Sequence, residues 1–351
     1  MGGAGSLGSS ASYSKSLTVS TGASFTYSSS ANQTLLDLRG AGTINLNGAG
    51  TVTISGDHQF TGTLNVSQTV NVKGGSGGTY ASTTTGLGRT TLIDIKNGGT
   101  LVAAGDTTTT SQNTLIGDGA PTTTIQINQG GVLTTSGYTA SNVPASSQTF
   151  NLSSIILSGG TISTGTGAIA SNWGIFNFGG TVTVTADSTI SAAFSTLTLS
   201  TGTVFDVAAG VTLNVTGTLH HSTSGTDVGF ILNKNTTCTG GCIGTMVLAG
   251  ANTYTGYSKI NGGTLSVGSG GSSGTNLSTS TVTISGGTLL GNTTGNTISN
   301  AITLSTGANV IAAQSGKTVT FGGIISGAGT GALTVGDATN NGTVVFSNTN
   351  T

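Results

Sequence analysis

Short stretches of alternating apolar and polar residues follow one another along almost the whole chain. Each stretch alternates for four to six residues and then breaks at Gly, Asn or Ser, as in TINLNG (43–48), TVTISG (51–56) and TLNVS (63–67). Alternation with a period of two is typical of a β-strand with one buried face. The pattern therefore predicts many short strands, and it continues as far as GALTVG (331–336).

A Gly-Gly-Thr turn recurs between these stretches, at 98–100, 159–161, 179–181, 262–264 and 286–288. Glycine supplies the positive φ that a chain needs where it turns from one face to the next. The second and third turns are 20 residues apart and the last two are 24 apart. Such a period suits one coil of a β-solenoid, whose units bury their apolar face only by stacking. We expect one continuous all-β solenoid over residues 1–351. Antiparallel sandwiches are the alternative, although their hairpins favour two-residue Asn-Gly turns between longer strands.

One longer motif occurs in more than one copy. Residues 244–256 align without gaps to residues 50–62 in the pattern G-T-apolar-x-apolar-x-G-x-x-x-aromatic-T-G. We interpret it as a strand, a turn, an aromatic that packs inward or caps, and a glycine leading to the next face. A third copy begins at Gly342 and stops at Thr351, so we expect the chain to be a fragment of a longer protein. The motif residues are Gly50, Gly56, Phe60 and Gly62 in one copy and Gly244, Gly250, Asn252, Tyr254 and Gly256 in the other, with Gly262 and Gly263 following.

This motif resembles the autotransporter-associated β-strand repeat, which is found in passenger domains of type V secreted bacterial proteins and in related large surface proteins. The resemblance is strong over residues 244–268 and the segment 297–336 that follows, extends to the truncated copy at 342–351, and is weaker at 50–62. It implies a right-handed parallel β-helix that is exported and displayed at or beyond the outer membrane. It supplies no catalytic motif. The start, MGGAGSLGSS, does not look like a signal sequence, so we expect that a signal was removed or that the chain is an interior segment.

The composition agrees with an ordered β protein and excludes several classes. The chain has 61 glycines, 5% charged residues and a net charge of -1, and all nine acidic residues are Asp. Straight-chain helix formers are scarce, while Val, Ile and Thr are abundant. The charge offers no basic surface for nucleic acid, and no apolar run is long enough for a membrane-spanning helix. Stacked like charges about 4.8 Å apart repel by about 1 kcal/mol even in water, which favours an uncharged composition.

Two cysteines, Cys238 and Cys242, lie in TTCTGGCIG. Three intervening residues, two of them Gly, allow a small local disulfide loop. Free thiols, or half of a metal site, remain alternatives. A disulfide would indicate an oxidising compartment.

Some carboxylates recur at about one coil of spacing, which raises the possibility of a catalytic or cation-binding cluster. These are Asp187, Asp206 and Asp227, then Asp94 and Asp118, then Asp37 and Asp57. Stacked carboxylates can bind a cation or raise a pKa. The simpler interpretation is that each accepts a backbone hydrogen bond in a turn. We predict no catalytic, cofactor-binding or metal-binding residues, and no cofactor.

The function that fits best is a structural or adhesive protein of the bacterial cell surface or extracellular space, serving as a rigid stalk or an adhesin passenger. A self-assembling fibre or matrix subunit, joined head to tail, is the alternative, and a β-helical glycan-active enzyme is the second. The expected partners are host or matrix glycans or proteins and no nucleic acid, with membrane contact only through a missing anchor or translocator. Binding would reside in the loop segments 73–91, 134–149 and 220–243.

Overall fold

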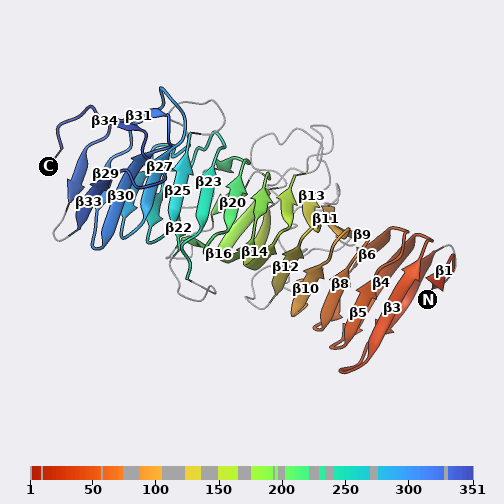
Figure 1. Ribbon diagram of the computed structural model, residues 1–351. Helices are drawn as coiled ribbons and strands as arrows, with labels where there is room; N and C mark the ends of the chain where they lie inside the picture. Colours follow the sequence, from red (N-terminus) through yellow and green to blue (C-terminus); the bar gives the residue numbers. More distant parts are fainter. Residues whose placement is uncertain are drawn as a thin grey trace, which may run out of the picture. The chain divides into compact units, whose positions relative to one another are not determined.

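The computed structural model describes residues 2–8, 11–56, 58–73, 87–104, 123–135, 149–164, 175–192, 194–196, 202–220, 229–233, 241–268, 276–327 and 331–350. All secondary structure in these residues is β-strand (Figure 1). The chain divides into two compact units, Met1–Asn177 and Phe178–Thr351. The expectation that one solenoid runs through residues 1–351 stays a prediction. No helix in the described part of the chain is long and apolar enough to cross a membrane.

Unit 1 contains two sheets, between which the chain alternates. The first sheet has the order β1 (Gly2–Gly3), β3 (Ser24–Ser29), β5 (Thr43–Leu46), β8 (Thr63–Val66), β10 (Leu92–Ile95), β12 (Thr124–Asn128) and β14 (Thr149–Ser158). The second sheet has the order β2 (Ser12–Thr18), β4 (Gln33–Gly40), β6 (Val52–Ser55), β9 (Thr69–Lys73), β11 (Thr100–Ala104), β13 (Val132–Thr135) and β15 (Thr161–Ser163), and β7 (Gln59–Phe60) pairs with β4.

Unit 2 repeats this arrangement and adds a third sheet. Its first sheet contains β16 (Ile175–Ala186), most of which lies in this unit, β19 (Thr203–Val207), β22 (Gly229–Leu232), β24 (Tyr257–Ile260), β26 (Thr281–Ile284), β29 (Ile302–Leu304) and β32 (Ile325–Gly327), with β18 (Phe194–Thr196) and β21 (Leu219–His220) beside it. Its second sheet contains β17 (Ser188–Ile190), β20 (Thr212–Val215), β23 (Thr245–Leu248), β25 (Thr264–Val267), β27 (Thr288–Gly291), β30 (Ala308–Ala313) and β33 (Ala332–Val335). The third sheet is β28 (Thr297–Ile298), β31 (Thr318–Phe321) and β34 (Thr343–Phe346).

Strand neighbours in these sheets pair in parallel and belong to successive coils. Thr43 of β5 pairs with Thr63 of β8, 20 residues later, and Thr264 of β25 pairs with Thr288 of β27, 24 residues later. Parallel strands cannot be joined by tight hairpins, so this pairing excludes the antiparallel sandwich. The fold is a parallel β-helix, and the coil length agrees with the spacing of the Gly-Gly-Thr turns.

The alternating pattern places apolar side chains inside each coil. In β5 and β8 the burial alternates between half-buried Thr or Asn and fully buried Ile, Leu or Val. Side chains on a strand point to opposite faces in turn, so one face fills the interior and the other meets solvent. In unit 2 the interior also holds an aromatic column, in which neighbouring ring centroids lie 5.9–6.3 Å apart: Phe178, Phe205, Phe230 and Tyr254.

Four of the five Gly-Gly-Thr turns join the first sheet to the second, as the sequence predicts. Gly98 and Gly99, for example, lie between the end of β10 and the start of β11. Gly98 has a φ of 76°, which side chains disfavour, and a Cβ added to Gly99 would lie 2.1 Å from the carbonyl oxygen of Val66 on the preceding coil. The turn expected at 179–181 is wrong: Gly179 and Gly180 lie inside β16, which continues extended through them.

We predict that Gly99→Ala destabilises unit 1, because the added methyl group collides with backbone that cannot move without breaking coil-to-coil hydrogen bonds. The expected loss is about 1–3 kcal/mol in the free energy of unfolding, measured by urea unfolding followed by circular dichroism. Gly2→Ala is the control, since its Cβ would meet only Ser28 Oγ at 3.4 Å. Equal stability of the two variants would contradict this role for Gly99.

Candidate functional site

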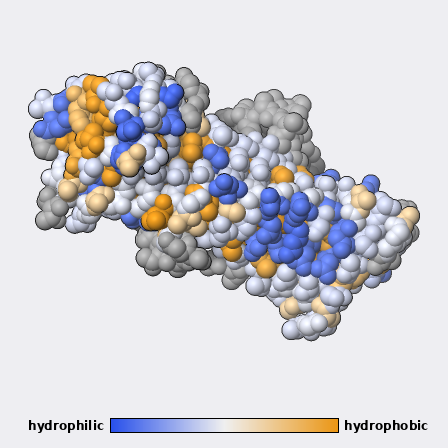
Figure 2. Space-filling view, in the orientation of Figure 1, coloured by the Kyte–Doolittle hydropathy of each residue, from blue (hydrophilic) through white to orange (hydrophobic). Residues whose placement is uncertain are grey.

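A ladder of polar side chains runs across the outer face of the first sheet of unit 1. It places one side chain on each coil, and backbone register brings neighbours side by side: Thr26, Asn45, Asn65, Asp94 and Gln126. Their strand neighbours Ile44, Leu64 and Ile93 are fully buried inside the coils. The ladder therefore faces outward, and Figure 2 shows hydrophilic residues gathered over β5, β8, β10 and β12.

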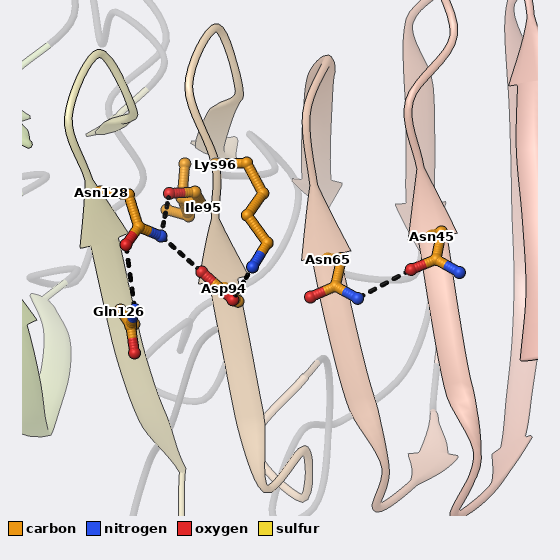
Figure 3. A network of polar contacts seen from close by, with 7 residues as sticks. All are labelled: Asn45, Asn65, Asp94, Ile95, Lys96, Gln126 and Asn128. Carbon is orange, nitrogen blue, oxygen red and sulfur yellow. Dashed lines mark hydrogen bonds and ion pairs between the residues drawn. The ribbon is translucent and has the colours of Figure 1, made fainter. Parts of the chain in front are cut away.

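Hydrogen bonds connect the ladder from coil to coil (Figure 3). Asn65 donates from Nδ2 to Asn45 Oδ1 at 2.7 Å, and Asn45 donates to Thr26 Oγ1 at 3.3 Å. Gln126 donates from Nε2 to Asn128 Oδ1 at 2.9 Å. Asn128 in turn donates to Asp94 Oδ1 at 2.6 Å and to the carbonyl of Ile95 at 3.1 Å. The amides thus bond one another as amides do in stacked parallel strands.

Asp94 is the one ionisable member of the ladder, and Lys96 pairs with it. The side chain of Asp94 is 9% exposed and that of Lys96 is 45% exposed, and the ammonium group contacts Asp94 Oδ2. With Asn128 on its other oxygen, the carboxylate is satisfied. The ladder is therefore neutral overall and rich in hydrogen-bonding groups, which suits contact with neutral polar molecules better than acid–base chemistry.

The carboxylates with coil-like spacing do not stack in the described residues. Asp206 pairs in register with Thr183, not with Asp187, and Asp187 accepts the backbone N–H of Thr212 at 2.7 Å. Asp94 stands between Asn65 and Gln126. The stacking of Asp187 on Asp206 was wrong because coil length varies, so equal sequence spacing does not bring two residues to equal positions. Asp57, Asp118 and Asp227 lie outside the described residues, and the described part of the chain contains no group of three or more His, Cys or Asp that could hold a metal ion.

The repeated motif has the same structure in both of its full copies. Gly50 precedes β6 and Gly244 precedes β23, and the next strand of the first sheet follows in each copy, as β8 and as β24. Several motif glycines meet the neighbouring coil so closely that an added Cβ would lie 1.9–2.3 Å from a backbone carbonyl oxygen: Gly50, Gly62, Gly244, Gly250 and Gly263. Gly56 instead has a φ of 123°, and Gly262 has ordinary space around it.

The aromatic of the motif packs inward, and its surroundings differ between copies in a matched way. Phe60 and Tyr254 are both buried in the core. The Tyr254 hydroxyl bonds with Ser258 Oγ at 2.7 Å, and burial raises the pKa of Tyr254 to about 12. In the other copy, the positions of Tyr254 and Ser258 hold Phe60 and Leu64. A buried hydroxyl needs a partner and a phenyl ring does not, so the two exchanges compensate each other.

A polar side chain two residues after the second motif glycine bonds the preceding coil. Asn252 Oδ1 accepts the backbone N–H of Leu219 at 2.7 Å. His58 takes the equivalent position, and its Nδ1 accepts the N–H of Leu38 at 3.0 Å. In the short third copy, Asn350 Oδ1 accepts the N–H of Ile325 at 2.9 Å. Sequence analysis did not recognise His58, although the alignment places it opposite Asn252 and both side chains can accept such a bond.

The interior position makes His58 unlike an exposed histidine. Burial lowers the pKa of His58 to about 4, although the nearby Asp37 carboxylate acts in the opposite direction. Arg39 on the same strand bonds Asp37 at 2.8 Å and offsets its charge. Nδ1 accepts a hydrogen bond, so the neutral ring carries its proton on Nε2, which has no partner in the described residues. Asn252 uses its second group better, donating to the carbonyl of Asn276 at 2.6 Å.

Cys242 is buried against Ala208 and is disulfide-bonded. Cys238 lies outside the described residues, so the local pairing of the two stays a prediction. Most of the three loop segments expected to carry binding, 73–91, 134–149 and 220–243, also lies outside them.

A family model for the passenger-associated-transport-repeat matches residues 44–68 and residues 243–267. This chain carries the autotransporter passenger repeat. Comparison with curated proteins and with solved structures gives no match. The two matched segments hold the motif copies described above, with His58 in one and Asn252 in the other. The passenger repeat implies a secreted or cell-surface protein. The model does not extend to residues 342–351, so the third copy stays a prediction, supported by the contact of Asn350.

We predict that His58→Asn removes a pH dependence from the stability of unit 1. The pKa of His58 is lower in the folded state than the ordinary 6.5, so the unfolded chain takes up a proton first as the pH falls. The wild type should therefore lose stability relative to the variant between about pH 6.5 and pH 4, by up to about 1.4 kcal/mol per pH unit. Urea unfolding at several pH values measures this difference. A constant difference across that range would contradict the buried, neutral His58.

Proposed function

We propose that this chain is a structural and adhesive passenger protein of the bacterial outer surface, in which the β-helix serves as a stalk or adhesin. The main support is the chemistry of the passenger repeat: its characteristic residues hold coil to coil and fill the core. Gly50 and Gly244 admit the neighbouring backbone, Asn252 bonds it, and Tyr254 fills the interior. These are tasks of a scaffold, which leaves the outward polar ladders for contact with other molecules.

The proposal also holds that the chain is not an enzyme. Hydrolysis of a glycosidic bond needs two carboxyl groups facing one substrate. The described carboxylates instead have separate local partners: Asp37 bonds Arg39, Asp94 bonds Lys96, and Asp337 bonds Asn340. This distribution supports a scaffold over the glycan-active alternative.

An oxidising location gives a direct test. Whole cells that make the protein are treated with a membrane-permeant alkylating agent before lysis, and the mass of the intact chain is then measured. We expect no alkylation at Cys238 or Cys242, because a disulfide persists outside the cytoplasm and is reduced inside it. Protease added to intact cells should also remove the chain. Two alkylated thiols on a protease-resistant chain would contradict an external location.

A self-assembling fibre is the second candidate, favoured by a group of exposed apolar side chains in unit 2. Most of the large apolar side chains exposed in the described residues lie on or next to its last strands: Ile324, Leu333, Val335, Val345 and Phe346. The proposed occupant is a second copy of this chain, paired along the open edges of β33 and β34. Opposite charges support the pairing, since exposed Asp337 follows β33 and exposed Lys15 lies on β2, the first strand of the second sheet in unit 1.

The fibre predicts mass that grows with concentration. Light scattering after gel filtration should detect oligomers of the wild type and mainly monomers of the double variant Val335→Lys, Phe346→Lys. Leu36→Lys is the control, because Leu36 is also exposed, at 37%, but lies on β4. A wild type that stays monomeric at high concentration would rule the fibre out.

A further inference from the structure

A groove of about 430 Å³ lies on unit 1, away from the Asp94 ladder, at the start of strands β4, β6 and β9. Its lining residues are Ala11, Asn32, Gln33, Thr34, Thr51, Thr53 and Asn71. The volume is within the range of small-molecule sites in proteins. None of the predicted loop segments contributes a residue to it.

The stacking of coils builds the floor of this groove. Backbone register sets Thr34 beside Thr53, and Thr53 beside Asn71, on three successive coils. Their neighbours Leu35, Ile54 and Val72 are buried in the core, so alternation directs these three side chains outward. The groove therefore presents one polar side chain per coil, at the interstrand spacing of about 4.8 Å.

The wall of the groove is held in place by hydrogen bonds. Gln33 is 2% exposed, and its side-chain oxygen accepts the N–H of Leu7 at 2.7 Å while its nitrogen donates to the carbonyl of Ala11 at 3.1 Å. Asn32 Oδ1 accepts the N–H of Thr51 at 2.9 Å. The groove is thus formed before any ligand arrives, which reduces the entropy lost on binding.

The side chains of the floor, in contrast, are available. Thr34, Thr53 and Asn71 are half-buried, and their polar groups make no hydrogen bond within the described residues. They offer two hydroxyl groups and one amide, each able both to donate and to accept.

The lining also selects the class of ligand. It contains no ionisable side chain, so it offers no cation to pair with phosphate, sulfate or carboxylate. The nearest charges on β4 belong to Asp37 and Arg39, which bond each other. Hydroxyl and amide groups without charge match the hydroxyl groups of a neutral sugar.

We propose that this groove binds a neutral oligosaccharide lying across successive coils, with Thr34, Thr53 and Asn71 as its hydrogen-bonding residues. The inference deepens the proposed adhesive function and rests on it. The groove is open and has no aromatic side chain in its lining, so the expected Kd for a short oligosaccharide is on the order of 1 mM. Many copies of the protein on one surface would then bind by avidity.

The test uses the full chain and measures binding by saturation-transfer NMR and calorimetry. The probes are neutral hexasaccharides of glucose, mannose and N-acetylglucosamine, with a sulfated heparin hexasaccharide as the charged comparison. We expect at least one neutral probe to bind, and Thr53→Val and Asn71→Ala each to weaken it at least fivefold. Thr283→Val is the matched control, because Thr283 is a half-buried threonine on the outer face of β26 in unit 2. Circular dichroism checks that each variant is folded.

Each result decides between the groove and the proposed function. No binding of any neutral probe, binding of the sulfated probe alone, or equal loss in Thr283→Val would overturn the groove as the site. Those results would leave the external location, which alkylation tests, unaffected. Conversely, neutral binding lost in Asn71→Ala by a chain with reduced cytoplasmic thiols would support the groove and contradict the surface function. Shortened probes after incubation would support a sugar site and contradict the non-enzymatic part of the proposed function.

Discussion

The parallel pairing of each coil with the next is the constraint from which the rest of this structure follows. Backbone hydrogen bonds place residue upon residue at about 4.8 Å, so any property of one position is met by the same position of the next coil. Apolar side chains then accumulate inside, as in the column of Phe178, Phe205, Phe230 and Tyr254. Charges would accumulate equally, and the chain avoids this with 5% charged residues. On the ladder from Thr26 to Gln126, one ionisable residue occurs and has its own partner.

The same constraint explains why the passenger repeat has its particular residues. Glycines stand where the backbones of two coils come closest, and Asn252 or His58 supplies an acceptor to a backbone N–H at a point where a strand ends. The two copies differ where the physics permits compensation: Tyr254 with Ser258 in one, Phe60 with Leu64 in the other. His58 keeps the acceptor and adds a titratable group, so this one corner of unit 1 responds to pH.

Contact with other molecules is the task left to the outer faces. The Asp94 ladder is already bonded along its length, which makes it a stabilising feature as well as a polar surface. The groove at Thr34, Thr53 and Asn71 differs because its floor has unused hydrogen-bonding groups. A neutral outer face fits an extracellular protein that makes weak, repeated contacts with sugars.

The sequence by itself determined the strands, the coil length and the inward aromatic, because these depend on local alternation and on a period that stacking must respect. It also led to the passenger repeat through residues 244–268. The tertiary structure decided which positions of different coils meet. Insertions change coil length, so Asp187 and Asp206 look stacked in the sequence and are not, and Gly179 and Gly180 resemble a turn but lie within β16. Register likewise brought together Thr34, Thr53 and Asn71, which no local pattern connects, because neighbours across coils are chosen by backbone pairing and not by distance along the chain.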